Sequence, residues 1–83
     1  MSQKFDNTQR LKALYLAIGY FRRRAGLTQD ELAEELGISR QHLAAIESPN
    51  MERGLSLEVL FNIATVLRVE PYQLLKFGLE ENL

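Results

Sequence analysis

The sequence predicts an all-α fold, a single compact five-helix bundle built from 83 residues. Two patterns predict it. Apolar residues recur every three or four positions, as on one face of a helix, and no stretch alternates polar and apolar residues as a strand does. Residues that begin helices (Ser, Thr, Asp) and residues that end them (Gly, Pro) separate these segments. Apolar residues make up 46% of the chain, which suffices for a core without disulfides, and there is no cysteine.

The first helix is expected in the segment that precedes Gly26. Apolar residues keep helical spacing there, at Leu11, Leu14, Ile18, Phe21 and Ala25. Asp6, with Gln9 three residues later, is a candidate cap for the start of this helix. Gly26 is expected to end it, because glycine accepts the left-handed backbone that follows many helices.

A second and a third short helix are predicted on either side of Gly37. Thr28 and Glu31 form a T-x-x-E capping box at the start of the second helix. The apolar face of this helix comprises Leu32, Ala33 and Leu36. Ser39 is placed to cap the third helix, which should end before Pro49.

The last two helices are predicted after the loop "SPNMERGL". Ser56 is the expected cap of the fourth helix, whose apolar face comprises Leu60, Ile63, Ala64 and Leu67. Pro71 suits the first position of a fifth helix, and Gly78 is expected to end it. The sequence has no repeat and no internal linker, so residues 1–83 are predicted to form one domain with its core at about 8–77.

Composition limits the classes of function. The formal net charge is −1, but residues 1–30 carry six Lys and Arg against two Asp, whereas residues 31–83 carry four against nine Glu. Such a distribution can place a basic face on an acidic protein. The N-terminal "MSQKFDNTQR" lacks the apolar stretch of a signal peptide, and no apolar run reaches membrane-spanning length. We therefore expect a cytoplasmic protein, which the absence of cysteine also fits.

The third helix has an unusual outward face. On a helical wheel, Leu43 and Ile46 point toward the core. The opposite side is small and polar, and consists of Gln41, Ala44, Ala45 and Ser48, with Arg40 and His42 at its edges. Such a helix fits the major groove of DNA, where Gln pairs with adenine and an alanine methyl contacts thymine. At the start of the second helix, Gln29 and the free backbone amides are placed to meet a phosphate.

These residues resemble a known family. The stretch "GLTQDELAEELGISRQHLAAIE" is similar to the helix-turn-helix of the phage-repressor-like (XRE, Cro/lambda-repressor-type) DNA-binding regulators. The resemblance runs from about Leu14 to Leu75 and includes "SLEVLFNIATVLRVEPYQLL", which resembles the family's fourth and fifth helices. It implies a lambda-repressor-like bundle with a central helix-turn-helix at about 28–48. The matching positions are Gln29, Ala33, Gly37, Leu43, Ile46 and Glu47.

The resemblance also implies roles for individual residues. Gln29 would contact backbone phosphate, and residues of the third helix would lie at or near the bases. Together with the wheel, this gives the expected DNA-binding residues Thr28, Gln29, Ser39, Arg40, Gln41, His42, Ala44, Ala45, Ser48 and Arg53. Arg53 lies in a loop that is longer than the family's common form, so the family's phosphate contacts do not transfer there position by position. Arg22 and Glu47 match a family pair that ties the first helix to the end of the third.

Other readings of the same residues stay open. The stretch 27–47 could be a plain helical hairpin, and Gln41 could be solvated surface. His42, the only histidine, has no partners for catalysis or metal binding, so we expect no enzyme, no metal site and no cofactor. Arg23 and Arg24 are interpreted as a solvated helix end, where cations suit the helix dipole.

The leading hypothesis is a sequence-specific DNA-binding transcriptional regulator, a repressor that binds a palindromic operator as a homodimer through its third helix. The alternative is the antitoxin of a toxin–antitoxin pair, a protein-binding module that also binds its own operator. The first helix carries Leu16, Ala17 and Tyr20 where the family usually has polar residues. This stripe is a candidate dimer contact, as is the region of the fourth and fifth helices, unless the chain's own ends cover it with Phe5, Phe77 and Leu79.

Overall fold

The computed structural model describes residues 5–48 and 55–81 of the chain, the last five as backbone only. Within these segments the fold is all-helical, as predicted. The helices are α1 (Thr8–Arg24), α2 (Gln29–Leu36), α3 (Arg40–Glu47), α4 (Leu57–Leu67) and α5 (Pro71–Glu81). Most of the predicted loop between the third and fourth helices, including Arg53, lies outside the described residues. None of these five helices combines the length and apolar character needed to cross a bilayer.

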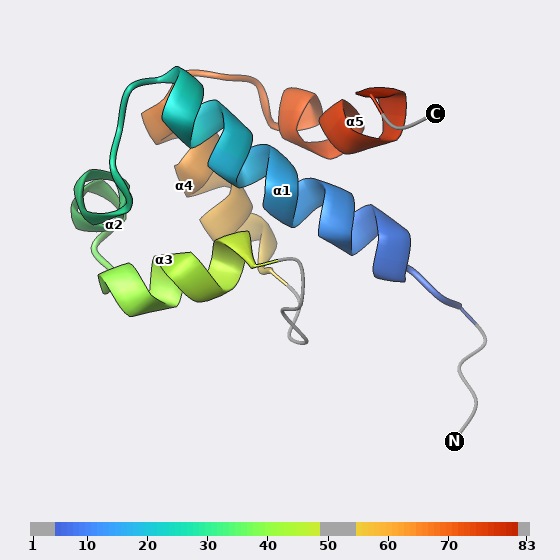
Figure 1. Ribbon diagram of the computed structural model, residues 1–83, viewed down its shortest axis with the longest axis horizontal. Coiled ribbons are helices and arrows are strands. Elements are labelled where there is room, and N and C mark those ends of the chain that lie inside the picture. The colour runs from blue at the N-terminus through green and yellow to red at the C-terminus, as the bar shows by residue number, and fades with distance from the viewer. Residues whose placement is uncertain (1–4, 49–54, 82–83) are drawn as a thin grey trace.

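The helices pack around one core (Figure 1). α1 lies against α5 and also contacts α3 and α4, while α2 packs against α3 and α4. Every helix contributes at least one large side chain that is fully buried, and these are Tyr15, Ile18, Leu32, Leu43, Ile46, Ile63 and Leu74. The pair α2 and α3 is thus fixed to the bundle through its inner side, and its outer side stays accessible to solvent.

The apolar faces predicted from helical spacing are the buried ones, with one exception. The residues confirmed in the core are Leu14, Ile18, Phe21, Leu32, Ala33, Leu43, Ile46, Leu60, Ile63, Ala64 and Leu67. Leu11 and Leu36 are partly buried against this core. Ala25 is exposed, because it is the C-cap of α1 and lies beyond the last helical turn. Tyr15 is 1% exposed although the spacing does not predict it.

Three helix ends share one turn geometry. Gly26 (φ 79°), Gly37 (φ 73°) and Arg68 (φ 60°) follow α1, α2 and α4 in the left-handed region. After each of them, the next N–H donates to the carbonyl oxygen five positions earlier, which is the Schellman arrangement. Arg68 makes this turn without glycine, at a steric cost of about 1–2 kcal/mol. The predicted stop at Gly78 is wrong: α5 continues to Glu81, and a glycine inside a helix costs only about 1 kcal/mol relative to alanine.

Side-chain caps begin three of the helices where the sequence predicts them. At α2 the Glu31 N–H donates to the Thr28 hydroxyl oxygen at 3.0 Å, and the Thr28 N–H donates to the Glu31 carboxylate at 2.8 Å. The capping box is therefore complete. Ser39 and Ser56 cap α3 and α4, each accepting the N–H three residues on, at 3.0 and 3.1 Å.

The predicted capping of the first helix by Asp6 and Gln9 is wrong. The N-cap is Asn7, and its side chain makes no cap bond. The Asp6 carboxylate instead accepts both the hydroxyl of Thr8, at 2.6 Å, and the Thr8 N–H, at 3.0 Å. These two bonds, the side-chain one first, lower the pKa of Asp6 from its usual value.

The stripe predicted on the first helix is only partly exposed. Leu16 is 50% exposed and Tyr20 39%, but Ala17 is completely buried. Ala17 is buried because α1 packs against three other helices, so its inner face is wider than a single row of side chains. Phe5 is 75% exposed and so does not pack over the stripe, and the side chains of Phe77 and Leu79 lie outside the described residues.

Candidate nucleic-acid interface

The outward face of α3 has the composition that the wheel predicts. Leu43 and Ile46 are 0% and 1% exposed, which fixes the rotation of the helix about its own axis. The residues on the other side are exposed or half-buried, and these are Ser39, Arg40, Gln41, His42, Ala44, Ala45 and Ser48. An accessible helix face of small and polar side chains can approach the edges of base pairs closely.

The turn between α2 and α3 is built by Gly37. Its positive φ lets the chain reverse, and the Ile38 N–H then returns to the Ala33 carbonyl oxygen at 3.0 Å. Ala33 itself is 2% exposed, so its methyl group belongs to the core between the helices. This short connection holds the start of α3 against the end of α2.

Glu47, the last residue of α3, joins three parts of the chain. Arg22 of α1 donates to both of its carboxylate oxygens, from Nε at 2.7 Å and from Nη2 at 3.1 Å. The third donor of Arg22, Nη1, reaches the carbonyl oxygen of Leu27 at 2.8 Å. The side chains of Arg22 and Glu47 are only 10% and 8% exposed. The ion pair expected from the resemblance is therefore present, and it is bidentate and nearly buried.

Gln29, at the first position of α2, is held by the same carboxylate. Its amide nitrogen donates to Oε1 of Glu47 at 3.1 Å. A primary amide has two N–H groups and one carbonyl oxygen, so the remaining groups can still bind a ligand. Sequence reasoning placed Gln29 at the DNA backbone but missed this bond. The bond joins residues that are far apart in the sequence, and only the fold brings them together.

Gly19 makes room for this network. A Cβ atom on Gly19 would lie 3.3 Å from Oε1 of Glu47 and 3.2 Å from Nη1 of Arg23. Both distances are closer than an ordinary carbon contact. Glycine in a helix interior costs about 1 kcal/mol relative to alanine. Here it permits a close approach of the carboxylate to α1, a role that sequence reasoning did not assign.

The start of α3 carries a second, weaker ion pair. Nε of Arg40 lies 3.9 Å from the Asp30 carboxylate, and the two side chains are 63% and 76% exposed. Exposed pairs of this kind contribute little to stability, so the Arg40 guanidinium stays free to move to another acceptor. The hydroxyl oxygen of Ser39 accepts the His42 N–H, but its own proton remains available for donation.

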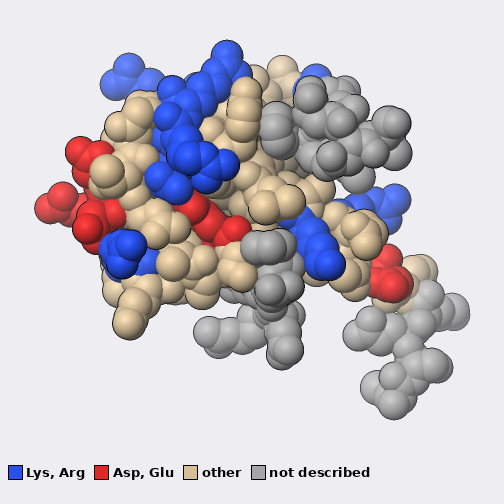
Figure 2. All heavy atoms as spheres, viewed as in Figure 1, with Lys and Arg blue, Asp and Glu red and all other residues tan. Residues whose placement is uncertain are grey.

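Charge is distributed unevenly around this surface. Figure 2 shows acidic side chains over α2 and basic side chains near the C-terminal end of α1. The exposed acidic residues of α2 are Asp30, Glu31, Glu34 and Glu35, and the exposed cations that end α1 are Arg23 and Arg24. Any attraction to phosphate must therefore be local, because the formal net charge of the chain is −1.

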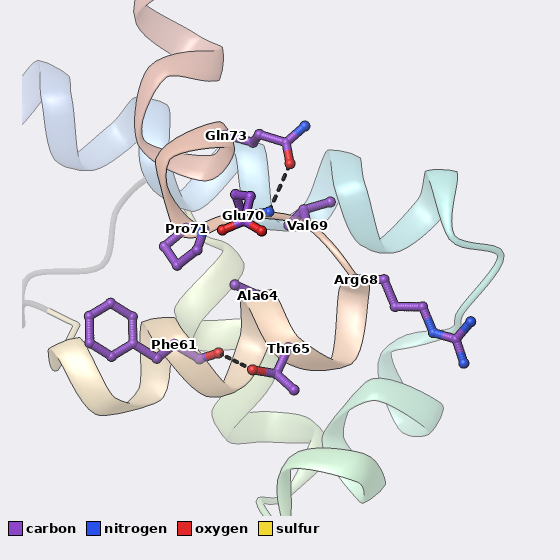
Figure 3. A pocket seen from close by; sticks show the side chains of 8 residues that line it. All are labelled: Phe61, Ala64, Thr65, Arg68, Val69, Glu70, Pro71 and Gln73. Atoms are coloured by element: carbon purple, nitrogen blue, oxygen red, sulfur yellow. Dashed lines mark hydrogen bonds between the residues drawn. The ribbon is translucent and has the colours of Figure 1, made fainter.

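A second group of exposed side chains, large and apolar, lies on α4 and α5. Figure 3 shows the hollow between these helices, with Phe61 contributed by α4 and Pro71 by the start of α5. The large apolar side chains that stay exposed on the two helices are Leu57 (68%), Phe61 (49%), Tyr72 (58%) and Leu75 (49%). We refer to these four residues as the α4–α5 surface. Among the described residues, no group of three or more His, Cys, Asp and Glu could hold a metal ion.

Comparisons with known proteins agree with this geometry. A family described as helix-turn-helix matches residues 18–74, from within α1 to within α5. The crystal structure of SinR, the master regulator for biofilm formation, in complex with DNA is similar at a TM-score of 0.67 and 31% identity, covering 75% of this chain and 97% of that one. The hypothetical transcription factor NHTF from Neisseria is similar at a TM-score of 0.70 and 30% identity, covering 90% and 83%. A search of curated proteins gave no match.

Proposed function

This chain belongs to the helix-turn-helix family of DNA-binding transcription regulators, and from this premise we propose that it is a sequence-specific repressor that binds a palindromic operator as a homodimer. The observation that carries the proposal is the outward face of α3. Leu43 and Ile46 anchor the helix in the core, and the accessible side presents small and polar side chains. The similarity to SinR, which was crystallised with DNA, supports the same assignment.

In the proposed complex α3 lies in the major groove. Gln41 faces the base edges from the centre of the outward side, and the flanking alanines offer methyl groups to thymine. Arg40 and His42 stand at the N-terminal edge, within reach of a base or a phosphate. Gln29, fixed by Glu47, meets the backbone at the start of α2. Arg53 belongs to this proposal only through the sequence, since it lies outside the described residues.

A homodimer follows from the small size of the reading surface. One such domain covers a half-site, and two-fold symmetry doubles the contacts and makes the preferred site palindromic. Between the two candidate dimer surfaces we favour the α4–α5 surface. It presents four large exposed apolar side chains, whereas α1 presents only Leu16 and Tyr20.

Phe61→Glu is expected to abolish dimerisation, because it would place a charge among the apolar side chains of the proposed interface. Sedimentation of the wild type at micromolar concentration should give twice the 9.5 kDa chain mass, and the variant should give the mass of one chain. Leu16→Glu is the matched control, since Leu16 is 50% exposed and Phe61 49%. A wild type that is strictly monomeric would contradict the proposal, and a dimer dissociated by Leu16→Glu alone would move the interface to α1.

DNA binding is expected to weaken steeply with salt, although the formal net charge is −1. Each phosphate neutralised by a cation releases condensed counterions, so two such contacts predict about a tenfold loss of affinity between roughly 50 and 200 mM salt. The experiment is selection of bound sequences from a random DNA pool, followed by affinity measurements on the selected duplex across a salt series. An affinity that does not change with salt would contradict the proposed function.

A further inference from the structure

Arg23 folds back along α1 instead of extending from its end. Nη1 of Arg23 lies 3.2 Å from the point where Gly19 would carry a Cβ atom, one helical turn earlier. Oε1 of Glu47 lies 3.3 Å from the same point. That oxygen also accepts the amide N–H of Gln29. The guanidinium of Arg23 therefore lies on the side of α1 that faces Gln29 and the end of α3.

Glu47 does not form an ion pair with Arg23. Its carboxylate already accepts three hydrogen bonds, two from Arg22 and one from Gln29. The ion pairs found among the described residues are Arg22 with Glu47 and Arg40 with Asp30, so Arg23 forms none there. Arg22 balances Glu47, so the exposed residue Arg23 adds a positive charge, in no ion pair among the described residues, on the side of α1 that faces Gln29.

We propose that Arg23 is a DNA-backbone contact, and that its guanidinium and the second N–H of Gln29 bind the same phosphate. This inference rests on the proposed DNA-binding function and replaces the interpretation of Arg23 as a solvated helix end. A guanidinium beside an amide N–H offers several donors to the oxygens of one phosphate. Glycine at position 19 lets the Arg23 guanidinium and the Glu47 carboxylate, which holds the Gln29 amide, approach over the same turn of α1.

The test compares Arg23→Gln with Arg24→Gln in the full chain. Both arginines are exposed, so neither change should alter the melting temperature. Arg23→Gln is expected to lower the affinity for the selected operator and for an unrelated duplex by the same factor, about three- to tenfold. It should also reduce the salt slope by about one per protomer, as loss of a phosphate contact does. Arg24→Gln should leave the slope as it is in the wild type.

A double variant tests whether the phosphate is shared. If Arg23 and Gln29 hold one phosphate, Arg23→Gln combined with Gln29→Ala should lose less affinity than the product of the two single losses. If the double variant instead lost as much affinity as the product of the two single losses, the shared phosphate would be ruled out. Equal salt slopes for Arg23→Gln and the wild type would overturn the contact itself while leaving the proposed function intact. A wild type that selects no DNA sequence would overturn both.

Discussion

Glu47→Ala is expected to lower the free energy of unfolding by about 3–4 kcal/mol, a large part of what a domain of this size has. The change leaves the guanidinium of Arg22 nearly buried without its carboxylate, and Arg22 is 8% exposed. It also removes the acceptor of the Gln29 amide. Arg22→Ala should have a similar cost, because it strands Glu47 and the Leu27 carbonyl oxygen. Thermal and denaturant melts of both variants measure the effect.

Two further variants separate this pair from a general effect of lost charge. Glu35→Ala, at an exposed position on α2, should change the free energy of unfolding by less than about 0.5 kcal/mol. The double variant Arg22→Met with Glu47→Leu should be less destabilised than either single alanine variant, because it leaves no charge unpaired. If the melts of Glu47→Ala and Arg22→Ala matched the wild type, the pair would have no structural importance.

Local signals were enough to predict most of the fold. A capping box or a left-handed glycine turn involves residues three to five positions apart, so Thr28 with Glu31 and the turn at Gly37 could be identified from spacing alone. The outward face of α3 could be predicted for the same reason, since helical geometry relates the buried Leu43 and Ile46 to the exposed side.

The features that sequence reasoning missed depend on tertiary packing. Ala17 and Tyr15 are buried because several helices surround α1, which a one-face periodicity does not represent. Arg68 takes a left-handed conformation that would ordinarily favour glycine, so the turn it makes has no sequence signature. The role of Gly19 appears only once α3 is placed against α1. The resemblance supplied the pairing of Arg22 with Glu47.

One substitution in α3 tests whether this helix contacts the bases. Gln41→Ala is expected to weaken binding to the selected operator by about 1–3 kcal/mol and to relax the preference at one base position in each half-site. Gln41 is exposed at the centre of the outward face, where its amide can donate to and accept from the N6 and N7 edge of adenine. Binding to unrelated DNA should change little, because that binding is electrostatic.

Gln29→Ala is the matched control, since it removes the same amide from the other helix of the motif. Gln29 is expected to contact phosphate, which carries no sequence information, so its loss should weaken all duplexes about equally. The two variants are measured against the selected operator and every single-base change within one half-site. The Gln41→Ala data should then lose contrast at one position, whereas the Gln29→Ala data should keep the wild-type pattern at lower affinity. If Gln41→Ala instead weakened every duplex by one common factor, α3 would not read the bases, and its exposed face would need another explanation.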